Sequence, residues 1–292
     1  MSVMLSARHA QVLVLTCGLL VSAVARADFD LTLSALADDD GGVNYDSVLT
    51  YVPNDHWTLG ASLGHSTSST QFSDFSGTSY GLSADLHNSQ FGARLAWRSW
   101  QDSNDFESRV GSGKLYWRRD ALEIGLLLEQ RDFDVQYSFT LANRTVSRTA
   151  SFSGDGVGLS VGWYGEIWGA YAQYQDNSYG DTLSNSLAAI VSVNPQTRPR
   201  LAALSASILS RASGVTDNEF SVGLDRSFSR SGLRIDAYQF KDQISGGDTT
   251  GVSLGYRYSI TSLVSIEATV GSADSDGFDN QTYGGLAISI RH

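Results

Sequence analysis

The side chains that could support nucleophilic hydrolysis are few. Such a reaction needs a serine activated by a positioned base, usually a histidine, and after residue 27 the histidines are His56, His65, His87 and His292. His56 and His87 fall in segments that we predict to be tight turns, and the run His87-Asn88-Ser89 has residue types that tight turns favour. We therefore expect no catalytic residues and no enzyme, and we keep a hydrolase centred on His65 as the third of three functional hypotheses.

Two acidic clusters could supply oxygen ligands to a cation. One is Asp38-Asp39-Asp40-Gly41-Gly42, and the other runs from Asp274 to Asn280. A calcium loop of the EF-hand type needs glycine at its sixth position and a bidentate glutamate at its twelfth. In the second cluster Gly277 is fourth and Gly285 is twelfth, so the pattern fails. We predict solvated loops, no metal site and no cofactor.

A third group of candidates consists of charged residues that share one parity along alternating segments. If these segments are strands around a lumen, the inward-facing charges are Arg94, Arg98, Lys114, Arg118, Glu123, Glu129, Arg131, Asp225, Arg234, Asp236, Arg257, Glu267 and Arg291. A basic stripe over residues 94–118 would then face acids across the lumen, and rings of charged side chains set the ion preference of a pore. The alternative is that these charges pair and seal a narrow interior.

The first 27 residues have the layout of a secretory signal peptide. Arg8 precedes an apolar run over residues 11–25, and Ala25-Arg26-Ala27 places small residues at the cleavage site. The run is short for a spanning helix, which needs roughly 20 apolar residues. We predict cleavage before Asp28, with a retained anchor as the alternative. Because Cys17 is the only cysteine, the segment 28–292 would carry no thiol.

Composition narrows the class of protein. The formal net charge of −11 argues against a nucleic-acid partner, because phosphate binding needs concentrated positive charge. With 29 glycines, 13 tyrosines, 12 phenylalanines and only 3 prolines, the chain favours strands and turns. We predict a single all-β domain over residues 28–292.

The strands alternate as a membrane barrel requires, because one face meets lipid and the other meets the lumen. Apolar residues occupy every second position in Trp57–Leu63, in Phe91–Trp97 and in Val264–Val270, and the same pattern recurs along most of the chain. The repetition, without a clear helical stretch between the runs, predicts a transmembrane antiparallel up-and-down β-barrel.

Connections and aromatic residues support the same architecture. With the N-terminus in the periplasm, short turns should alternate with longer outer connections. Short turns are predicted at Pro53–His56, His87–Gln90, Arg118–Ala121, Gly165–Trp168, Ser227–Ser231 and Thr261–Ser262, and longer connections at 65–79, 100–107, 132–154, 243–249 and 272–281. Aromatic residues of the outward parity gather at the strand ends beside the short turns, as lipid–water boundaries favour.

The number of strands depends on residues 176–217. Two alternating runs flank Asn194–Pro199, and as a hairpin they bring the count to about 16 strands, which we prefer, whereas as one long loop they leave about 14. A short helix at 200–211 also fits the apolar spacing. In the segment 121–165 the alternation continues past the membrane, and we predict a hairpin that rises above the outer face or folds into the mouth.

The final segment resembles the terminal strand of Gram-negative outer-membrane β-barrel proteins. Leu286, Ile288 and Ile290 lie on one parity, as in that superfamily, although His292 stands where its members usually end in phenylalanine. The resemblance covers residues 28–292 as architecture, and no motif points to one family. It implies an outer-membrane location, contact with membrane lipid and lipopolysaccharide, and insertion by the barrel-assembly machinery.

Two functional hypotheses follow besides the hydrolase. An aqueous lumen fits a porin-like channel for passive diffusion of small hydrophilic solutes, since a barrel of about 16 strands leaves a channel unless it is plugged. The stripe at 94–118 would favour anionic solutes. The alternative is a closed barrel that acts as a surface-interaction or adhesion protein through its outer loops.

Overall fold

The computed structural model describes residues 28–39, 41–69, 74–102, 106–141, 144–179, 215–242, 247–276 and 280–292. Within these ranges no helix is long and apolar enough to cross a membrane. The described residues form one antiparallel sheet of fourteen strands. The strands are β1 (Asp28–Asp38), β2 (Val43–Asn54), β3 (Trp57–Ser69), β4 (Asp74–His87), β5 (Phe91–Asp102), β6 (Phe106–Arg119), β7 (Leu122–Leu141), β8 (Arg144–Tyr164), β9 (Trp168–Tyr179), β10 (Thr216–Ser227), β11 (Ser231–Asp242), β12 (Asp248–Ser259), β13 (Val264–Ser275) and β14 (Gln281–Arg291).

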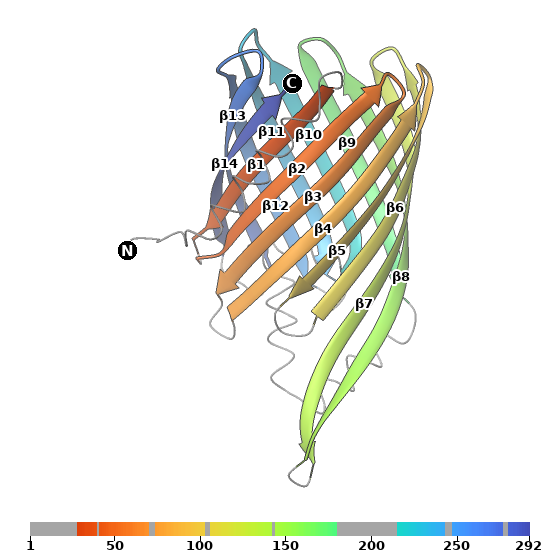
Figure 1. Ribbon diagram of the computed structural model, residues 1–292, viewed down its shortest axis with the longest axis vertical. Coiled ribbons are helices and arrows are strands. Elements are labelled where there is room, and N and C mark those ends of the chain that lie inside the picture. Colours follow the sequence, from red (N-terminus) through yellow and green to blue (C-terminus); the bar gives the residue numbers. More distant parts are fainter. Residues whose placement is uncertain are drawn as a thin grey trace.

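The sheet closes on itself, so that the barrel has no free edge along its main body (Figure 1). The first strand pairs with the last, with Leu31 opposite Ile290 and Leu33 opposite Ile288. At this seam the His292 backbone N–H donates to the Phe29 carbonyl at 2.9 Å. The two rings stack with their centroids 5.4 Å apart. His292 therefore makes an aromatic contact at the seam, although it is not the phenylalanine usual at that position.

The preferred count of 16 strands is not confirmed, and the described barrel has the alternative count of 14. The reason is the pairing of β9 with β10, in which Phe220 lies opposite Tyr174 and Leu224 lies opposite Ala170. Because these two strands are hydrogen-bonded to each other, no further pair can stand between them in the wall. Residues 180–214, which hold most of the hairpin considered within 176–217 and all of the helix considered at 200–211, lie outside the described residues, as does the leader 1–27.

Side chains alternate between the two faces of the wall, and most of the exposed large apolar ones face outward. Leu82, Leu95, Leu159 and Leu286 are each more than 60% exposed, which is the reverse of a soluble protein and fits an outer surface covered by lipid. The aromatic residues of this parity beside the short turns are also exposed: Tyr51, Trp57, Phe91, Trp163, Trp168, Phe228 and Tyr258.

The predicted short turns are present, and together they define what we call the turn end of the barrel. Side-chain oxygens hold several of them by accepting backbone N–H groups. Asn54 accepts from His56 at 2.9 Å, and Asn88 accepts from Gln90 and Phe91 at 2.8 Å. The His87-Asn88-Ser89 run thus contains an asparagine whose carbonyl oxygen holds a turn, as asparagine commonly does.

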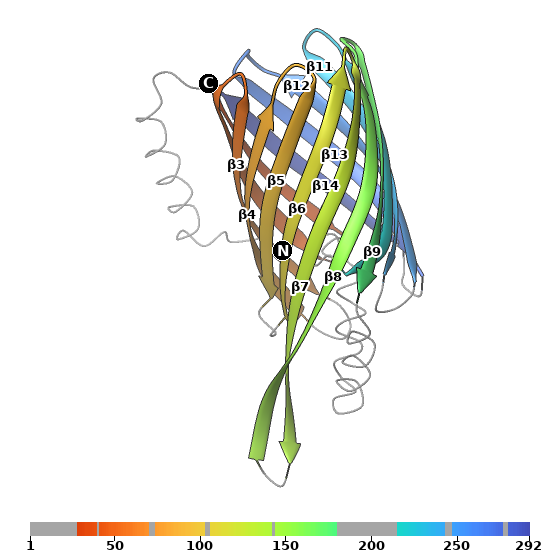
Figure 2. The same cartoon turned by 90° about the vertical axis from the view of Figure 1, so that its right-hand side faces the viewer.

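Some connections that we predicted to be long are mostly strand. In the segment 65–79, β3 continues to Ser69 and β4 begins at Asp74. The segment 132–154 is the hairpin of β7 and β8, which pair with each other as far as Leu141 opposite Arg144. Their pairing with β6 and β9 stops earlier, so the hairpin twists beyond the barrel, as Figures 1 and 2 show. Of the two predicted alternatives, the hairpin therefore extends beyond the barrel and does not fold into its mouth. Polar side chains did not end these strands because backbone pairing alone sustains them.

Candidate functional site

The structure places most of the predicted inward charges near the turn end, on the face opposite the exposed leucines. They stand directly opposite one another across neighbouring strands, as in the pairs Arg94–Lys114, Asp225–Arg234 and Arg257–Glu267. We call this set the turn-end belt. It consists of Asp30, Asp85, Arg94, Lys114, Arg118, Glu123, Asp225, Arg234, Asp236, Arg257, Glu267 and Arg291.

Asp85 anchors one part of the belt. Its buried carboxylate accepts a hydrogen bond from Arg94 Nε at 2.8 Å and another from the Tyr116 hydroxyl at 2.7 Å. His87 Nδ1 lies 3.3 Å from the same carboxylate. Tyr116 fits against the wall because Gly92 has no side chain, since a Cβ there would lie only 2.1 Å from the tyrosine ring. The arginine side chain is thereby directed into the lumen by a carboxylate lying at the wall.

Glu123 anchors two further cations of the belt. Its carboxylate accepts from Lys114 Nζ at 2.7 Å and from Arg118 Nη2 at 2.6 Å. Both cations also lie over the Tyr116 ring, at 5.6 and 5.4 Å from its centroid. Of the cations in the predicted basic stripe at 94–118, Arg94, Lys114 and Arg118 are each paired with a carboxylate on a neighbouring strand. The ion pairs still leave positive charge at the lumen surface, because each cation is more exposed than its carboxylate partner.

In the ion pairs of the belt the cation is the more exposed partner. The side-chain exposures are 59% for Arg94 against 7% for Asp85, and 42% for Arg118 against 8% for Glu123. Across the lumen, Arg234 is 55% exposed and Asp236 is 22% exposed. The pair of Arg291 and Asp30 at the seam follows the same order. Guanidinium groups thus form the solvent-facing surface of the belt, and the carboxylates lie behind them.

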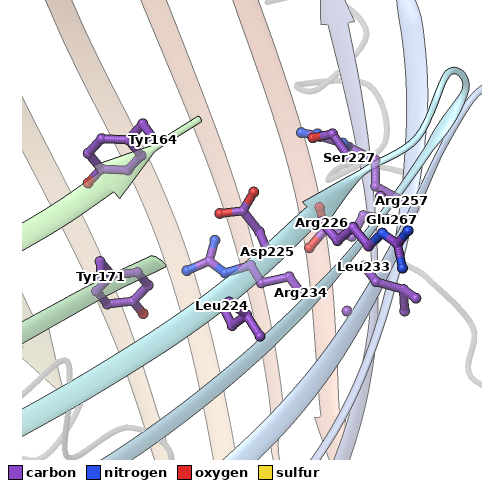
Figure 3. A pocket seen from close by; sticks show the side chains of 12 residues that line it. Tyr164, Tyr171, Leu224, Asp225, Arg226, Ser227, Leu233, Arg234, Arg257 and Glu267 are labelled. Atoms are coloured by element: carbon purple, nitrogen blue, oxygen red, sulfur yellow. The ribbon is translucent and has the colours of Figure 1, made fainter. Parts of the chain in front are cut away.

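A cavity of about 470 Å³ opens in the lumen wall of this belt. It lies where β11 and β12 carry Gly232 and Gly255, whose missing side chains leave a hollow between long neighbours. The polar side chains that line it are Tyr164, Tyr171, Asp225, Arg226, Ser227, Arg234, Arg257 and Glu267 (Figure 3). Within the described ranges Asp225, Arg257 and Glu267 form no ion pair, whereas Arg234 is bonded to Asp236.

The lumen is packed in the other half of the barrel. Trp100, Ser108, Phe133 and Phe152 lie in one row across β5 to β8. All of them are at most 5% exposed. Phe106 covers this row, with its ring centroid 5.8 Å from that of Trp100 and 6.1 Å from that of Phe133. Inward side chains at this level are therefore shielded from water, unlike the arginines of the belt.

Of the remaining predicted charges, Glu129 and Arg131 belong to this packed half. Arg131 is 4% exposed. Its guanidinium donates to Glu129, to the Tyr179 hydroxyl at 3.2 Å and to Thr216 Oγ1 at 2.9 Å. Arg98 stands between the two halves, opposite Gly81 and Val110. Arg131 ties β7 to β9 and β10, so this residue has a structural role where sequence parity suggested a lumen-lining one.

Sequence reasoning missed several residues of the belt. Asp30 and Asp85 occupy inward positions of alternating runs, so parity alone could have added them. Tyr116 shares the parity of Lys114 and Arg118. We did not predict an inward tyrosine, because we expected aromatic residues at the lipid boundary. The tyrosines and glycines of the cavity carry no local signal, since their role depends on strands that are adjacent only in the closed barrel.

Comparison with known proteins supports the architecture. No protein-family model and no curated protein matches the sequence. Among solved structures, the CymD monoaromatic hydrocarbon channel matches with a TM-score of 0.55 at 8% identity, over 91% of this chain and 88% of CymD. The chain has the fold of Gram-negative outer-membrane β-barrels.

Two further structures match less closely. OmpTdeltaL8 of Vibrio cholerae, an outer-membrane protein with loop L8 deleted, has a TM-score of 0.48 at 11% identity, with 91% of this chain and 98% of that chain covered. An anion-selective porin from Comamonas acidovorans has a TM-score of 0.46 at 8% identity, over the same shares of the two chains.

Proposed function

We propose that the protein is an outer-membrane channel for passive diffusion of small hydrophilic solutes, with a preference for anions. The observation that carries the proposal is the exposure of the cations in the turn-end belt. A lumen side chain that is half exposed, as in Arg94 and Arg234, is in contact with water. We place the turn end in the periplasm and the outward apolar band in contact with membrane lipid and, at its outer rim, lipopolysaccharide. Insertion by the barrel-assembly machinery is part of the same proposal.

The anion preference follows from the depth of the charges. Cations and acids of the belt are similar in number, so their count does not decide the sign of the field. A solute in the lumen approaches the guanidinium groups more closely than the carboxylates behind them, and Coulomb energy falls with distance. Narrow, low-dielectric walls strengthen such local fields. The packed half around Trp100 and Phe133 would form the constriction that limits solute size.

The test is the reversal potential of the refolded protein in a planar bilayer under a KCl gradient. We expect a potential of the sign that anion preference gives. Replacing Arg94, Arg234 and Arg291 together with glutamine should move it toward zero. Arg109→Gln is the matched control, because Arg109 is comparably exposed but lies on the outward parity. A cation-selective wild type, or a triple variant identical to the control, would refute the anion preference.

A second candidate function is a closed barrel that binds a partner through the β7–β8 hairpin. Two observations favour it: the hairpin stands clear of its neighbours, and the inward side chains of the packed half are buried. Deleting residues 136–149 should then abolish binding of whole cells to the host or phage surface while the barrel still folds. Binding that survives the deletion would exclude this function.

We further propose that the protein is not a hydrolase. His65 Nδ1 is 3.5 Å from the Thr78 hydroxyl, which is the limit of a hydrogen bond. The absence of turnover with lipid and peptide substrates is the expected result. Turnover that disappears in His65→Gln would establish the third hypothesis instead.

A further inference from the structure

The cavity in the turn-end belt has the features of a ligand subsite. Gly232 and Gly255 are among its lining residues, so part of its wall is backbone and does not depend on side-chain conformation. A Cβ added at Gly232 would come no closer than 3.5 Å to any neighbour, whereas one at Gly255 would lie 3.2 Å from Glu267 Oε1. A small group on Gly232 would thus fit without displacing a neighbour, and the cavity of about 470 Å³ faces the lumen through which solutes would pass.

Arg257 offers this space a guanidinium that no described side chain engages in an ion pair. Its Nη2 would lie 3.6 Å from a Cβ placed on Gly232, so the group lies over the hollow. A guanidinium presents two parallel N–H donors that match the two oxygens of a carboxylate. In most of the belt such donors are already bonded to an acid. At Arg257 they are available to a solute.

Asp225 and Glu267 border the same space with carboxylates that only accept hydrogen bonds. Each stands opposite an arginine in the sheet register: Asp225 opposite Arg234, and Glu267 opposite Arg257 (Figure 3). Positive and negative groups alternate along this wall, so the wall has no excess of negative charge that would attract a cation. Acceptors balanced in this way suit the hydroxyl groups of a solute, which donate hydrogen bonds without adding charge.

The tyrosines give the cavity one less polar side. The Tyr171 hydroxyl donates to Asp236 at 2.8 Å, and the Arg234 guanidinium lies 5.9 Å from the centroid of its ring. Tyr171 is thereby fixed, and Tyr164 lines the cavity from the neighbouring strand. Fixed aromatic rings present an apolar face to the C–H groups of a solute.

We propose that this cavity is a subsite for a small polyhydroxylated carboxylate, that is, a sugar acid. Arg257 binds the carboxylate, Asp225 and Glu267 accept from hydroxyls, and the tyrosines contact the carbon chain. The assignment rests on the proposed function in that a conducting lumen would deliver the solute. Binding itself requires only the folded barrel, so the two can fail separately.

The experiment is equilibrium binding of gluconate to the folded protein in detergent. Hexanoate, with the same carbon number but no chain hydroxyls, and sorbitol, a polyol without charge, are the matched probes. We expect gluconate to bind at least about tenfold more tightly than either, a difference of about 1.4 kcal/mol. Equal binding of gluconate and hexanoate, or tighter binding of alanine as a zwitterion, would overturn the proposal.

Variants separate the subsite from the field of the belt. Arg257→Gln and Asp225→Asn should each weaken gluconate binding about tenfold or more. Gly232→Val should do the same by filling the hollow without changing any charge. Arg109→Gln is the control, because Arg109 is an exposed cation on the outward parity and lies outside both the belt and the cavity, and it should leave binding unchanged. Gluconate binding by a barrel that passes no current would retain the subsite and exclude the channel; current without selective binding would exclude the subsite alone.

Discussion

Replacing Glu123 with glutamine should destabilise the barrel by about 2 kcal/mol. The side chain of Glu123 is 8% exposed and accepts from two cations, Lys114 at 2.7 Å and Arg118 at 2.6 Å. Glutamine has nearly the same shape but no charge, and its amide nitrogen would point a donor at a cation. The substitution therefore removes an interaction without creating a cavity.

The magnitude follows from the exposure of the two partners. A hydrogen bond to a charged group contributes roughly 1.5–3 kcal/mol when it is shielded from water, and Lys114, with a side chain 20% exposed, falls in that range. Arg118 is 42% exposed and recovers water, so its share is reduced to at most about 1 kcal/mol. The carbonyl oxygen of glutamine retains one acceptor, which brings the expected loss to about 2 kcal/mol.

The assay is urea unfolding in lipid vesicles followed by tryptophan emission, with the free energy taken from the midpoint and the slope. Glu107→Gln is the matched control, because Glu107 accepts from Arg109 at 2.7 Å with both side chains well exposed, at 30% and 48%. It should cost less than about 0.5 kcal/mol. If the two variants lose the same free energy, depth in the wall does not govern the strength of these pairs.

Three further predictions concern the wall and its ends. Gly92→Ala should displace the Tyr116 ring and break its hydrogen bond to Asp85, which would lower the free energy of unfolding by about 1–3 kcal/mol. Unchanged stability would mean that the ring can move without losing this hydrogen bond. Thr282 donates to Asp39 through its hydroxyl at 2.7 Å and its amide at 3.0 Å, which lowers the pKa of that loop carboxyl. The stabilisation from these bonds is present above the ordinary carboxyl pKa and is lost as pH falls through the lowered pKa. Thr282→Val should therefore raise the midpoint of the Asp39 titration followed by NMR, and an unmoved midpoint would contradict this prediction. His292→Ala should remove the ring stacking at the barrel seam at a loss of about 0.5–1.5 kcal/mol, measurable by the same urea unfolding; a loss equal to zero would show that the stacking is incidental.

The outward and inward faces were predictable because a wall between lipid and water requires apolar and polar side chains to alternate along every strand. The face of a residue such as Leu95 or Arg94 then follows from its parity alone. The number of strands was not predictable in this way. The alternating runs within 176–217 satisfy this requirement, but only the direct pairing of Phe220 with Tyr174 shows that no strand separates β9 from β10.

The chemistry of the site was predictable as a list of charges and not as an arrangement. Parity placed Arg94 and Arg257 on the same face, yet one is bonded to a carboxylate and the other forms no ion pair within the described residues. That difference depends on which strand lies beside which, and on glycines such as Gly232 that leave space. The sequence at any single strand carries neither kind of information.

Single-channel recording of the refolded protein in a planar bilayer tests the central claim most directly. We expect discrete current steps, because the arginines of the turn-end belt are in contact with water inside a closed wall. A folded barrel that inserts into the bilayer and passes no current would contradict it, and the packed half around Trp100 and Phe133 would then be a seal instead of a constriction.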